Sequence, residues 1–397
     1  MPIPKSSLFL NSYHILIDGL FDATPILLSF IIIGFGADEK AVGSILSLAF
    51  IVTTLAGLAT IYLSQRWGFL RTICIVTTCL GVGYTANAFS PNLYTTGLFC
   101  IIALAGHGLF HNIAFSYLTS HNDRAVLGKA MSNFTVLGDM GRIPFVSLAG
   151  YAGAISLWGF AGWRSVCLLY GLLALAASVY VLYLNTNKTT PLFPQDPTRS
   201  STPRRFPSFA LLHDPQVRLA LSASGLDAFS SDRLFAFLPF LLLAKGIEPT
   251  VIGTFALGFT VGSLAGKFVC GRMTDIFGNR RVFIVSELLM AVLVVVLLFS
   301  QQLWCIISAA MLLGAVTRGT VPIIQTIITE PVKNATNFDD IFALNSLLRG
   351  SINTASPAIF GFLAAAMGIE FVYGLMSAVA TLAVLPIFFL RTDKTTP

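Results

Sequence analysis

The sequence has few charged residues for its length. Of its 397 residues, 11% are Asp, Glu, Lys or Arg, 55% are hydrophobic, and the mean hydropathy is +0.80. Ordinary soluble domains carry about 25% charged residues, so this composition indicates a membrane protein with many spans. Its apolar runs are continuous over about 20 residues, which predicts helices rather than the alternating strands of a β-barrel.

The sequence also lacks the motifs of common enzymes and pumps. It has no nucleotide-binding loop, nucleophile elbow or H-E-x-x-H motif, so we expect no catalytic site, no cofactor and no direct use of ATP. The six cysteines fall in apolar segments without metal or redox spacing. The net charge of +6 comes from basic residues scattered over short loops, so we expect no nucleic-acid partner.

Apolar runs between turn signals predict about twelve spans and an all-α fold. A polar, proline-rich and basic segment, 186–213, separates residues 1–185 from 214–397 and predicts a cytoplasmic linker between two six-helix bundles. The expected spans are 8–34, 41–64, 71–90, 95–119, 127–152, 163–185, 215–244, 249–271, 281–299, 303–329, 338–367 and 370–390.

The placement of basic residues predicts the orientation in the membrane. With both termini inside, about 16 of the 24 Lys and Arg residues face the cytoplasm and about 3 (Lys40, Arg164, Lys245) face outward. The opposite orientation would reverse this bias. We therefore expect a multi-pass protein of the bacterial inner membrane, monomeric in the lipid bilayer, with both termini in the cytoplasm.

One offset of about 210 residues relates the two halves of the sequence. Such a repeat is typical of transporters that hold one binding site between two bundles. The residues that it pairs are Asp22 with Asp232, Gly36 with Gly246, Gly43 with Gly253, Gln65 with Asp275, Gly68 with Gly278, and Arg71 with Arg281.

The segment "GRMTDIFGNRR", residues 271–281, resembles the loop signature G-x-x-x-D-x-x-G-x-[RK]-[RK] of the major facilitator superfamily. It falls between expected spans eight and nine, where that family carries its second copy. The first-half counterpart, "IYLSQRWGFLR", keeps a glycine and the flanking basic residues. The resemblance implies a conformational latch made by Gly271, Asp275, Gly278, Arg280, Arg281, Gly68 and Arg71; the alternative is a solvated charged turn.

Two further segments resemble the fosmidomycin-resistance type of exporter within that superfamily. They are "GHGLFHNIAFSYL", residues 106–118, and the glycine-rich "GKAMSNFTVLGDMGRIP", residues 128–144. Asp139 and Arg142 stand where exporters of this type usually carry neutral residues. The resemblance implies a major facilitator fold of twelve transmembrane helices in two pseudo-symmetric six-helix bundles.

A charge inside a bilayer costs about 2.5–3.5 kcal/mol on insertion scales, so embedded charges need a cavity or a partner. The resemblance implies that spans one, four, seven and ten line the cavity. Arginines there favour anions, because guanidinium binds carboxylate or phosphate through two hydrogen bonds; the alternative is neutralisation by Asp227 or Asp232. The expected substrate-binding residues are His107, His111, Arg318, Arg349 and Asp18.

Embedded carboxylates are also candidates for proton coupling. In "HILIDGLFDATP" His14, Asp18 and Asp22 recur every four residues and share one helix face. A carboxylate poised between burial and a nearby arginine can exchange a proton as the cavity changes side. A structural pair such as Asp139 with Arg142 is the alternative. The expected coupling residues are Asp22, Asp139, Arg142, Asp227, Asp232 and Arg233.

Two features leave further alternatives open. The four-residue spacings of His14 with Asp18 and of His107 with His111 suit two ligands on one metal ion, or a pair of histidines that relays protons. Glu287, in expected span nine, has no evident role except pairing with a basic loop residue.

These observations predict a secondary active, proton-coupled symporter or antiporter that moves a small, polar, anionic organic solute by alternating access, with export favoured over import. Two alternatives remain. One is a transporter of a divalent metal or metal chelate that uses the His and Asp residues of spans one and four. The other is a transporter-like membrane sensor, against which stands the lack of a soluble domain. The 33 phenylalanines are also compatible with an amphiphilic solute.

Overall fold

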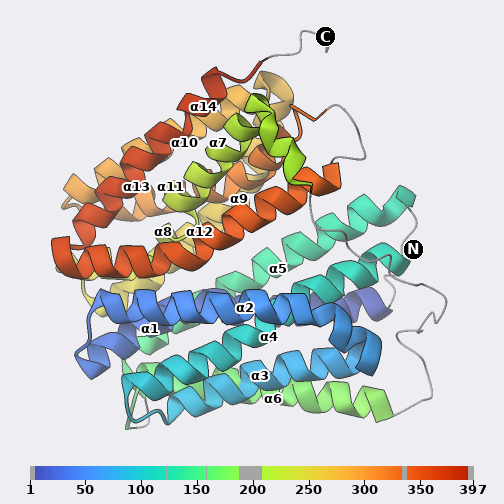
Figure 1. Ribbon diagram of the computed structural model, residues 1–397. Helices are drawn as coiled ribbons and strands as arrows, with labels where there is room; N and C mark the ends of the chain where they lie inside the picture. The colour runs from blue at the N-terminus through green and yellow to red at the C-terminus, as the bar shows by residue number, and fades with distance from the viewer. Residues whose placement is uncertain (1–4, 122–123, 158, 187–207, 333–337, 392–397) are drawn as a thin grey trace. The chain divides into compact units, whose positions relative to one another are not determined.

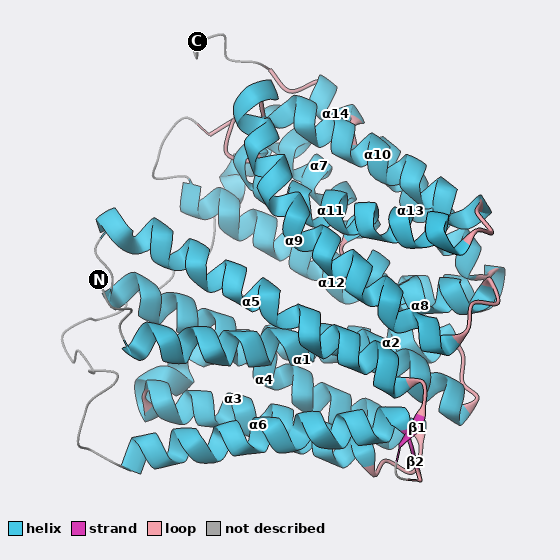
Figure 2. Cartoon of the chain, turned by 180° about the vertical axis from the view of Figure 1, so that it is seen from behind, coloured by secondary structure: helices cyan, strands magenta, loops and turns pink. Residues whose placement is uncertain are grey.

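The structure is a computed structural model, and the part of the chain that it describes is almost entirely helical (Figures 1 and 2). Its strands, β1 (Ser156–Leu157) and β2 (Phe160–Ala161), form one short antiparallel pair. The described residues are 5–121, 124–157, 159–186, 208–332 and 338–391.

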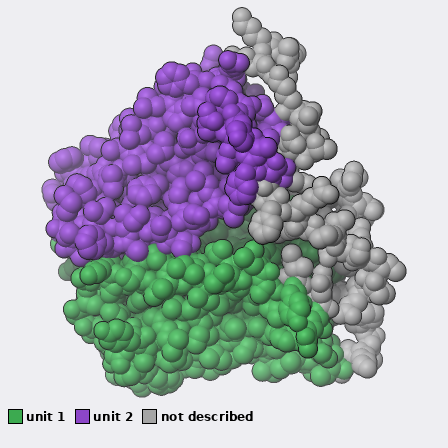
Figure 3. All heavy atoms as spheres, viewed as in Figure 1, with its two compact units in different colours: residues 1–200, 246–257 green, residues 201–245, 258–397 purple. Residues whose placement is uncertain are grey.

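The chain divides into two compact units, shown in separate colours in Figure 3. The first unit comprises residues 1–200 and 246–257, and the second comprises 201–245 and 258–397. The predicted bundle limits stay a prediction, and residues 187–207 of the predicted linker lie outside the described residues.

The first unit contains six long helices. In this unit α3 packs against α6, α1 against α5, and α2 against α4. The helices are α1 (Lys5–Phe35), α2 (Glu39–Trp67), α3 (Phe69–Ala88), α4 (Leu93–His121), α5 (Arg124–Gly153) and α6 (Gly162–Thr186).

The remaining helices begin with η1, at the end of the predicted linker, and continue after it. The short 3-10 helix η2 (Pro249–Val251) lies in the 246–257 segment of the first unit, and α9 begins there. These elements are η1 (Phe209–His213), α7 (Pro215–Ser231), α8 (Leu234–Ala244), α9 (Ile252–Phe277), α10 (Asn279–Phe299), α11 (Leu303–Ile327), α12 (Phe338–Met367), α13 (Ile369–Ala383) and α14 (Leu385–Phe388).

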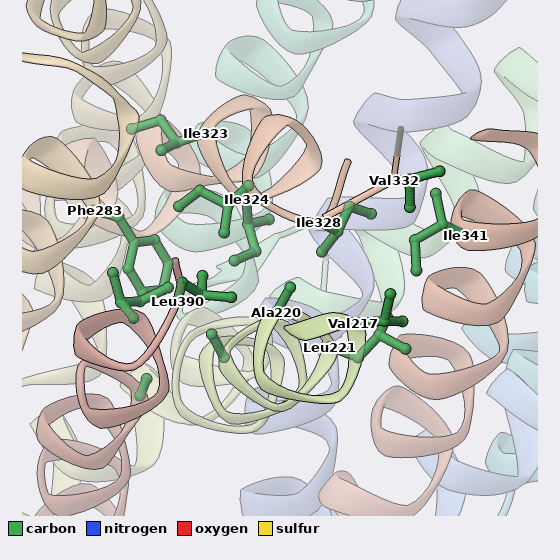
Figure 4. Packing of buried hydrophobic residues seen from close by; sticks show 14 of the residues in the cluster. Val217, Ala220, Leu221, Phe283, Ile323, Ile324, Ile328, Val332, Ile341 and Leu390 are labelled. Carbon is green, nitrogen blue, oxygen red and sulfur yellow. The ribbon is translucent and has the colours of Figure 1, made fainter. Parts of the chain in front are cut away.

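The second unit is held together by apolar packing among its helices. Helix α10 packs against α11 and α13, and α7 packs against α12 and α13. One buried cluster joins side chains of α7, α10, α11 and α12, as the close view in Figure 4 shows. Its members include Val217, Ala220, Leu221, Phe283, Ile323, Ile324 and Ile341.

All twelve predicted spans are helical, and the predicted all-α membrane fold is confirmed. Nine helices in the described part of the chain are long and apolar enough to cross a membrane. Three predicted spans fall outside that set: α5, α12, and the segment divided into α7 and α8. Helices α7 and α8 have only 17 and 11 residues. Helices α5 and α12 carry embedded charges such as Asp139, Arg142 and Arg349, which lower their hydropathy.

Glycines at equivalent positions of the repeat make similar turns. Gly68 ends α2 with φ 80°, and Gly278 precedes α10 with φ 81°. Gly36 and Gly246 have φ 64° and 75°. Residues other than glycine rarely adopt positive φ, because their Cβ would clash with the backbone. The offset of 210 residues therefore repeats backbone geometry as well as residue type.

Candidate functional site

The carboxylate of Asp18 lies at the centre of a polar cluster inside the first unit. Helix α1 contributes His14, α4 contributes His107 and His111, and α5 contributes Arg142. Asp18 Oδ1 is 3.0 Å from His111 Nε2 and 3.4 Å from His107 Nε2, and Asp18 Oδ2 is 3.1 Å from His14 Nε2 and 3.3 Å from Arg142 Nη2. Asp18 and His14 are both buried. The structure thus brings the four-residue patterns of α1 and α4 together around one carboxylate.

The close approach of α1 and α5 positions this cluster. A Cβ at Gly141 would lie 2.4 Å from the backbone oxygen of Ile15, and a Cβ at Gly138 would lie 2.3 Å from Cε1 of His14. Contacts that short are not tolerated, so only glycine allows the two helices to pack this closely. The glycine-rich sequence of α5 therefore makes room for the His14 ring.

Aromatic rings and a backbone carbonyl fix the orientation of the histidines. His14 Nδ1 donates to the backbone oxygen of Phe134 at 2.8 Å, and the His14 ring stacks on Phe134 with centroids 3.9 Å apart. His107 stacks on Phe21 with centroids 3.7 Å apart. These contacts turn Nε2 of each ring toward Asp18. The ligand atoms of His14, Asp18 and His111 all lie within 4.8 Å of one another, close enough to hold one metal ion.

Arg142 joins three carboxylates of the first unit. Its Nε is 2.7 Å from Asp22 Oδ2, and its Nη1 is 3.2 Å from Asp139 Oδ1. The i,i+3 pair of Asp139 and Arg142 that the sequence allows is therefore present. Arg142 also binds Asp18 and Asp22, and no spacing in the sequence indicates these two residues as its partners.

The second unit holds a related cluster around Arg349 of α12. Its Nη1 is 2.6 Å from Asp227 Oδ2, and its Nη2 is 2.9 Å from Asp232 Oδ1. Asp227 is fully buried in α7, and Asp232 caps the C-terminal end of that helix. Asn353, one turn after Arg349, donates to Asp232 Oδ2 at 2.7 Å. Arg349 is thus neutralised by the two carboxylates, as the alternative interpretation of the sequence proposed.

Glu287 of α10 belongs to the same cluster. Its side chain is buried beside Asp227, and its Oε2 has no hydrogen-bond partner among the described residues. Two buried carboxylates next to each other repel, and a proton on one of them would relieve that repulsion. The expected pairing of Glu287 with a basic loop residue is wrong, because the nearest charged groups are those of the cluster. Sequence spacing could not reveal a contact between α7 and α10.

The other embedded cations differ in their surroundings. Arg233 precedes α8 and donates from Nη2 to the backbone oxygen of Asn353 at 3.2 Å. Arg318 of α11 is partly exposed and makes no hydrogen bond or ion pair with any residue of the described ranges. Among the described residues, the predicted substrate contacts His107 and His111 therefore lie together, whereas Arg318 has no partner.

The predicted latch residues are only partly connected. Arg280 lies 2.6 Å from Glu330 Oε2 and donates to the backbone oxygens of Leu390 and Arg391. Asp275, Arg281 and Arg71 are exposed. Arg280 therefore joins the start of α10 to the segments that follow α11 and α14. Sequence reasoning missed Glu330, which lies outside the signature.

Comparisons with known proteins agree with this architecture. The Major Facilitator Superfamily model matches residues 219–397. Over 147 residues the chain is 29% identical to the multidrug resistance protein MdtG of Proteus mirabilis (strain HI4320), a match that covers 36% of this chain and 35% of the relative. The match thus spans about a third of that relative's length.

Three solved structures share the fold over nearly the whole chain. The bacterial homologue of the human lysosomal transporter Spinster, in an inward-facing and occupied conformation, has a TM-score of 0.75 at 14% identity, covering 97% of this chain and 96% of the other. The nucleoside transporter NupG gives 0.77 at 12%, covering 98% and 100%. The D-xylose-proton symporter gives 0.73 at 15%, covering 98% of each chain.

The structural likenesses show the fold, and the match to the family model and the likeness to MdtG add sequence evidence. Together they show a multi-pass membrane protein with the fold of major facilitator transporters, whose residues 219–397 match the model of that superfamily.

Proposed function

We propose that the chain is a proton-coupled secondary active transporter that exports a small, polar, anionic organic solute by alternating access. Transporters of this kind rearrange two repeated halves around a site near the middle of the membrane. The name of MdtG supports export, since that relative is a multidrug resistance protein. The distribution of basic residues supports cytoplasmic termini and a bacterial inner membrane.

Arg318 is the observation that carries the proposed substrate charge. The guanidinium groups of Arg142 and Arg349 are each matched by at least two carboxylates. Arg318 has no such partner in the described part of the chain, although it lies within a helix long enough to span the membrane. Because an uncompensated charge there is costly, we infer that an anionic group of the solute supplies the missing partner.

The cluster around Arg349 supports proton coupling. Arg349 pairs with Asp227 and Asp232, and the buried side chain of Glu287 lies next to Asp227. A proton on Asp227 or Glu287 would relieve the repulsion between these two buried carboxyl groups. Loss of that proton would leave buried, unpaired negative charge, which is expensive in a membrane. We therefore propose that proton binding and release at this cluster accompany the transport cycle.

A thermal-shift screen of the purified protein tests the substrate class. The panel comprises organic carboxylates, phosphonates, sugars, nucleosides and amphiphilic cations. We expect carboxylates or phosphonates to raise the melting temperature, because a ligand that binds the folded state stabilises it.

Variants at Arg318 make the screen specific. Arg318→Ala should weaken binding of the active anion about 10- to 150-fold, since a hydrogen bond to a charged group contributes about 1.5–3 kcal/mol. Arg318→Lys should be intermediate because lysine keeps the charge and loses the bidentate geometry. Arg272→Ala removes an exposed arginine near the end of α9 and should bind like the wild type. Stabilisation by amphiphilic cations alone, equal in all variants, would reject an anionic solute.

A further inference from the structure

Three histidines of the first unit present their Nε2 atoms to the carboxylate of Asp18. The Nε2 atoms of His14, His107 and His111 lie 3.0–3.4 Å from the carboxylate oxygens of Asp18. His111 Nε2 and His107 Nε2 are themselves only 3.1 Å apart. At most one hydrogen can lie between two such nitrogens, so at least one lone pair points into the cluster.

The hydrogen bond between His14 and the backbone of Phe134 shows that a second lone pair faces the cluster. A backbone oxygen can only accept, so the bond to Phe134 places a hydrogen on His14 Nδ1. In a neutral imidazole this leaves a bare lone pair on Nε2, facing a carboxylate. His14 Nε2, which is 3.1 Å from Asp18 Oδ2, and Asp18 Oδ1, which is 3.0 Å from His111 Nε2, are both buried and have no hydrogen-bond partner among the described residues. A lone pair that faces a carboxylate oxygen repels it unless a proton or a metal cation lies between them.

We propose that His14, Asp18, His107 and His111 bind a divalent transition-metal ion of the Zn²⁺ class. Zn²⁺ bonds to nitrogen and oxygen of about 2.0–2.2 Å place tetrahedral ligand atoms about 3.3–3.5 Å apart. The three histidines lie 3.0–3.4 Å from Asp18, and the ligand atoms of His14, Asp18 and His111 lie within 4.8 Å of one another, so side-chain movements that draw them together reach that geometry. The carbonyl of Phe134 already holds His14 as the outer partner of a metal-binding imidazole does.

The charge of the cluster fits a divalent cation. With neutral imidazoles, the carboxylates of Asp18, Asp22 and Asp139 and the guanidinium of Arg142 give a formal charge of −2. One divalent ion makes the cluster neutral. Three imidazoles and one carboxylate suit Zn²⁺, Co²⁺ or Ni²⁺, whereas Mg²⁺ and Ca²⁺ prefer oxygen ligands. Two protons on the imidazoles would provide the same neutrality, and this is the alternative that the experiment must separate.

A Co²⁺ titration of the purified full-length protein in detergent tests the site. After chelator treatment, the wild type should bind one Co²⁺ per chain and develop the strong visible absorption of a tetrahedral nitrogen–oxygen site, which Zn²⁺ should abolish by competition. His111→Ala should weaken Co²⁺ binding by about 100-fold or more, beyond the effect typical of outer-shell partners. Its side chain is the most exposed of the four ligands, at 29%, so this variant is the least disturbing to the fold.

Two controls make the test decisive. His213→Ala removes an exposed histidine of η1 and should bind Co²⁺ like the wild type. His107→Gln is a second ligand variant should His111→Ala prove unstable. Absence of the absorption in the wild type, or equal affinity in the wild type and both ligand variants, would overturn the proposal and favour protonated imidazoles. Arg318→Ala leaves the histidines intact and should keep Co²⁺ binding, so failure of the anion proposal and failure of the metal proposal are separable.

Discussion

The two units solve the same electrostatic problem with different partners. In each, the first long helix carries two carboxylates close together in sequence, Asp18 and Asp22 or Asp227 and Asp232. In each, one arginine from a later helix binds both, Arg142 at 3.3 and 2.7 Å and Arg349 at 2.6 and 2.9 Å. The repeat therefore extends from glycine turns to buried ion pairs.

The units differ in what completes each cluster. The first unit adds three imidazoles around Asp18, and the second adds a further acid, Glu287, next to Asp227. Imidazoles can take a metal ion or protons from outside, whereas two adjacent carboxyl groups need only one shared proton. This difference suggests that the first unit is the cation-binding half and that the second is the proton-exchanging half.

We expect the largest effect from variants that test which unit couples transport to the pH gradient. Glu287→Gln keeps a hydrogen-bond donor beside Asp227 and removes the exchangeable proton, so it should abolish transport driven by a pH gradient while energy-independent exchange continues. The measurement is uptake into proteoliposomes of the solute identified by the thermal-shift screen, with and without the gradient. Asp22→Asn is the matched variant in the first unit and should retain gradient-driven transport. If Asp22→Asn alone uncouples transport, the proton site belongs to the first unit.

The next effect compares the two arginines. Removing one partner of a buried ion pair typically costs about 3–5 kcal/mol. Arg349→Ala should reach that range, because Asp227 is fully buried and its remaining hydrogen-bond donors, the hydroxyls of Ser231 and Thr320, carry no charge. Arg142→Ala should cost less, because the imidazoles near Asp18 can take up protons. Unfolding in mixed micelles with increasing SDS measures both, and an equal loss of stability would mean that the histidines give no compensation.

The smallest effect concerns one glycine in each arginine-bearing helix. A Cβ at Gly138 meets the His14 ring, so Gly138→Ala should cost about 1–3 kcal/mol, as overpacking does, and should weaken Co²⁺ binding. Gly350 of α12, next to Arg349, has open space where its Cβ would lie. Gly350→Ala should be neutral or stabilising by up to about 1 kcal/mol. Similar stability losses in the two variants would show that the space around His14 is not specific.

The sequence predicted the helices well because each apolar run and each turn glycine is local information. It also singled out the embedded charges, since a charge in an apolar helix needs a partner, and several of them lie in the clusters around Arg142 and Arg349; their roles stay predictions. It could not predict partners across helices, such as Arg142 with Asp18 or Glu287 with Asp227, because tertiary contacts decide them. Asn353, which donates to Asp232, was also missed. Its position one turn after Arg349 is a signal in the sequence that could have identified it. The roles of the latch residues, and the closer likeness to fosmidomycin-resistance exporters, stay predictions.

The ion pair between Asp18 and Arg142 has a consequence for the synthesis of the chain. The two residues are 124 positions apart in the sequence, and Asp227 and Arg349 are 122 positions apart. At about 5–20 residues per second, a ribosome needs roughly 6–25 s after making Asp18 before it makes Arg142. Until α4 brings His107 and His111, which also precede Arg142 in the sequence, α1 has its own His14, one turn away, as a nearby counter-group. The order in which the helices leave the ribosome thus makes His14 the earliest available partner for the first buried acid of the chain.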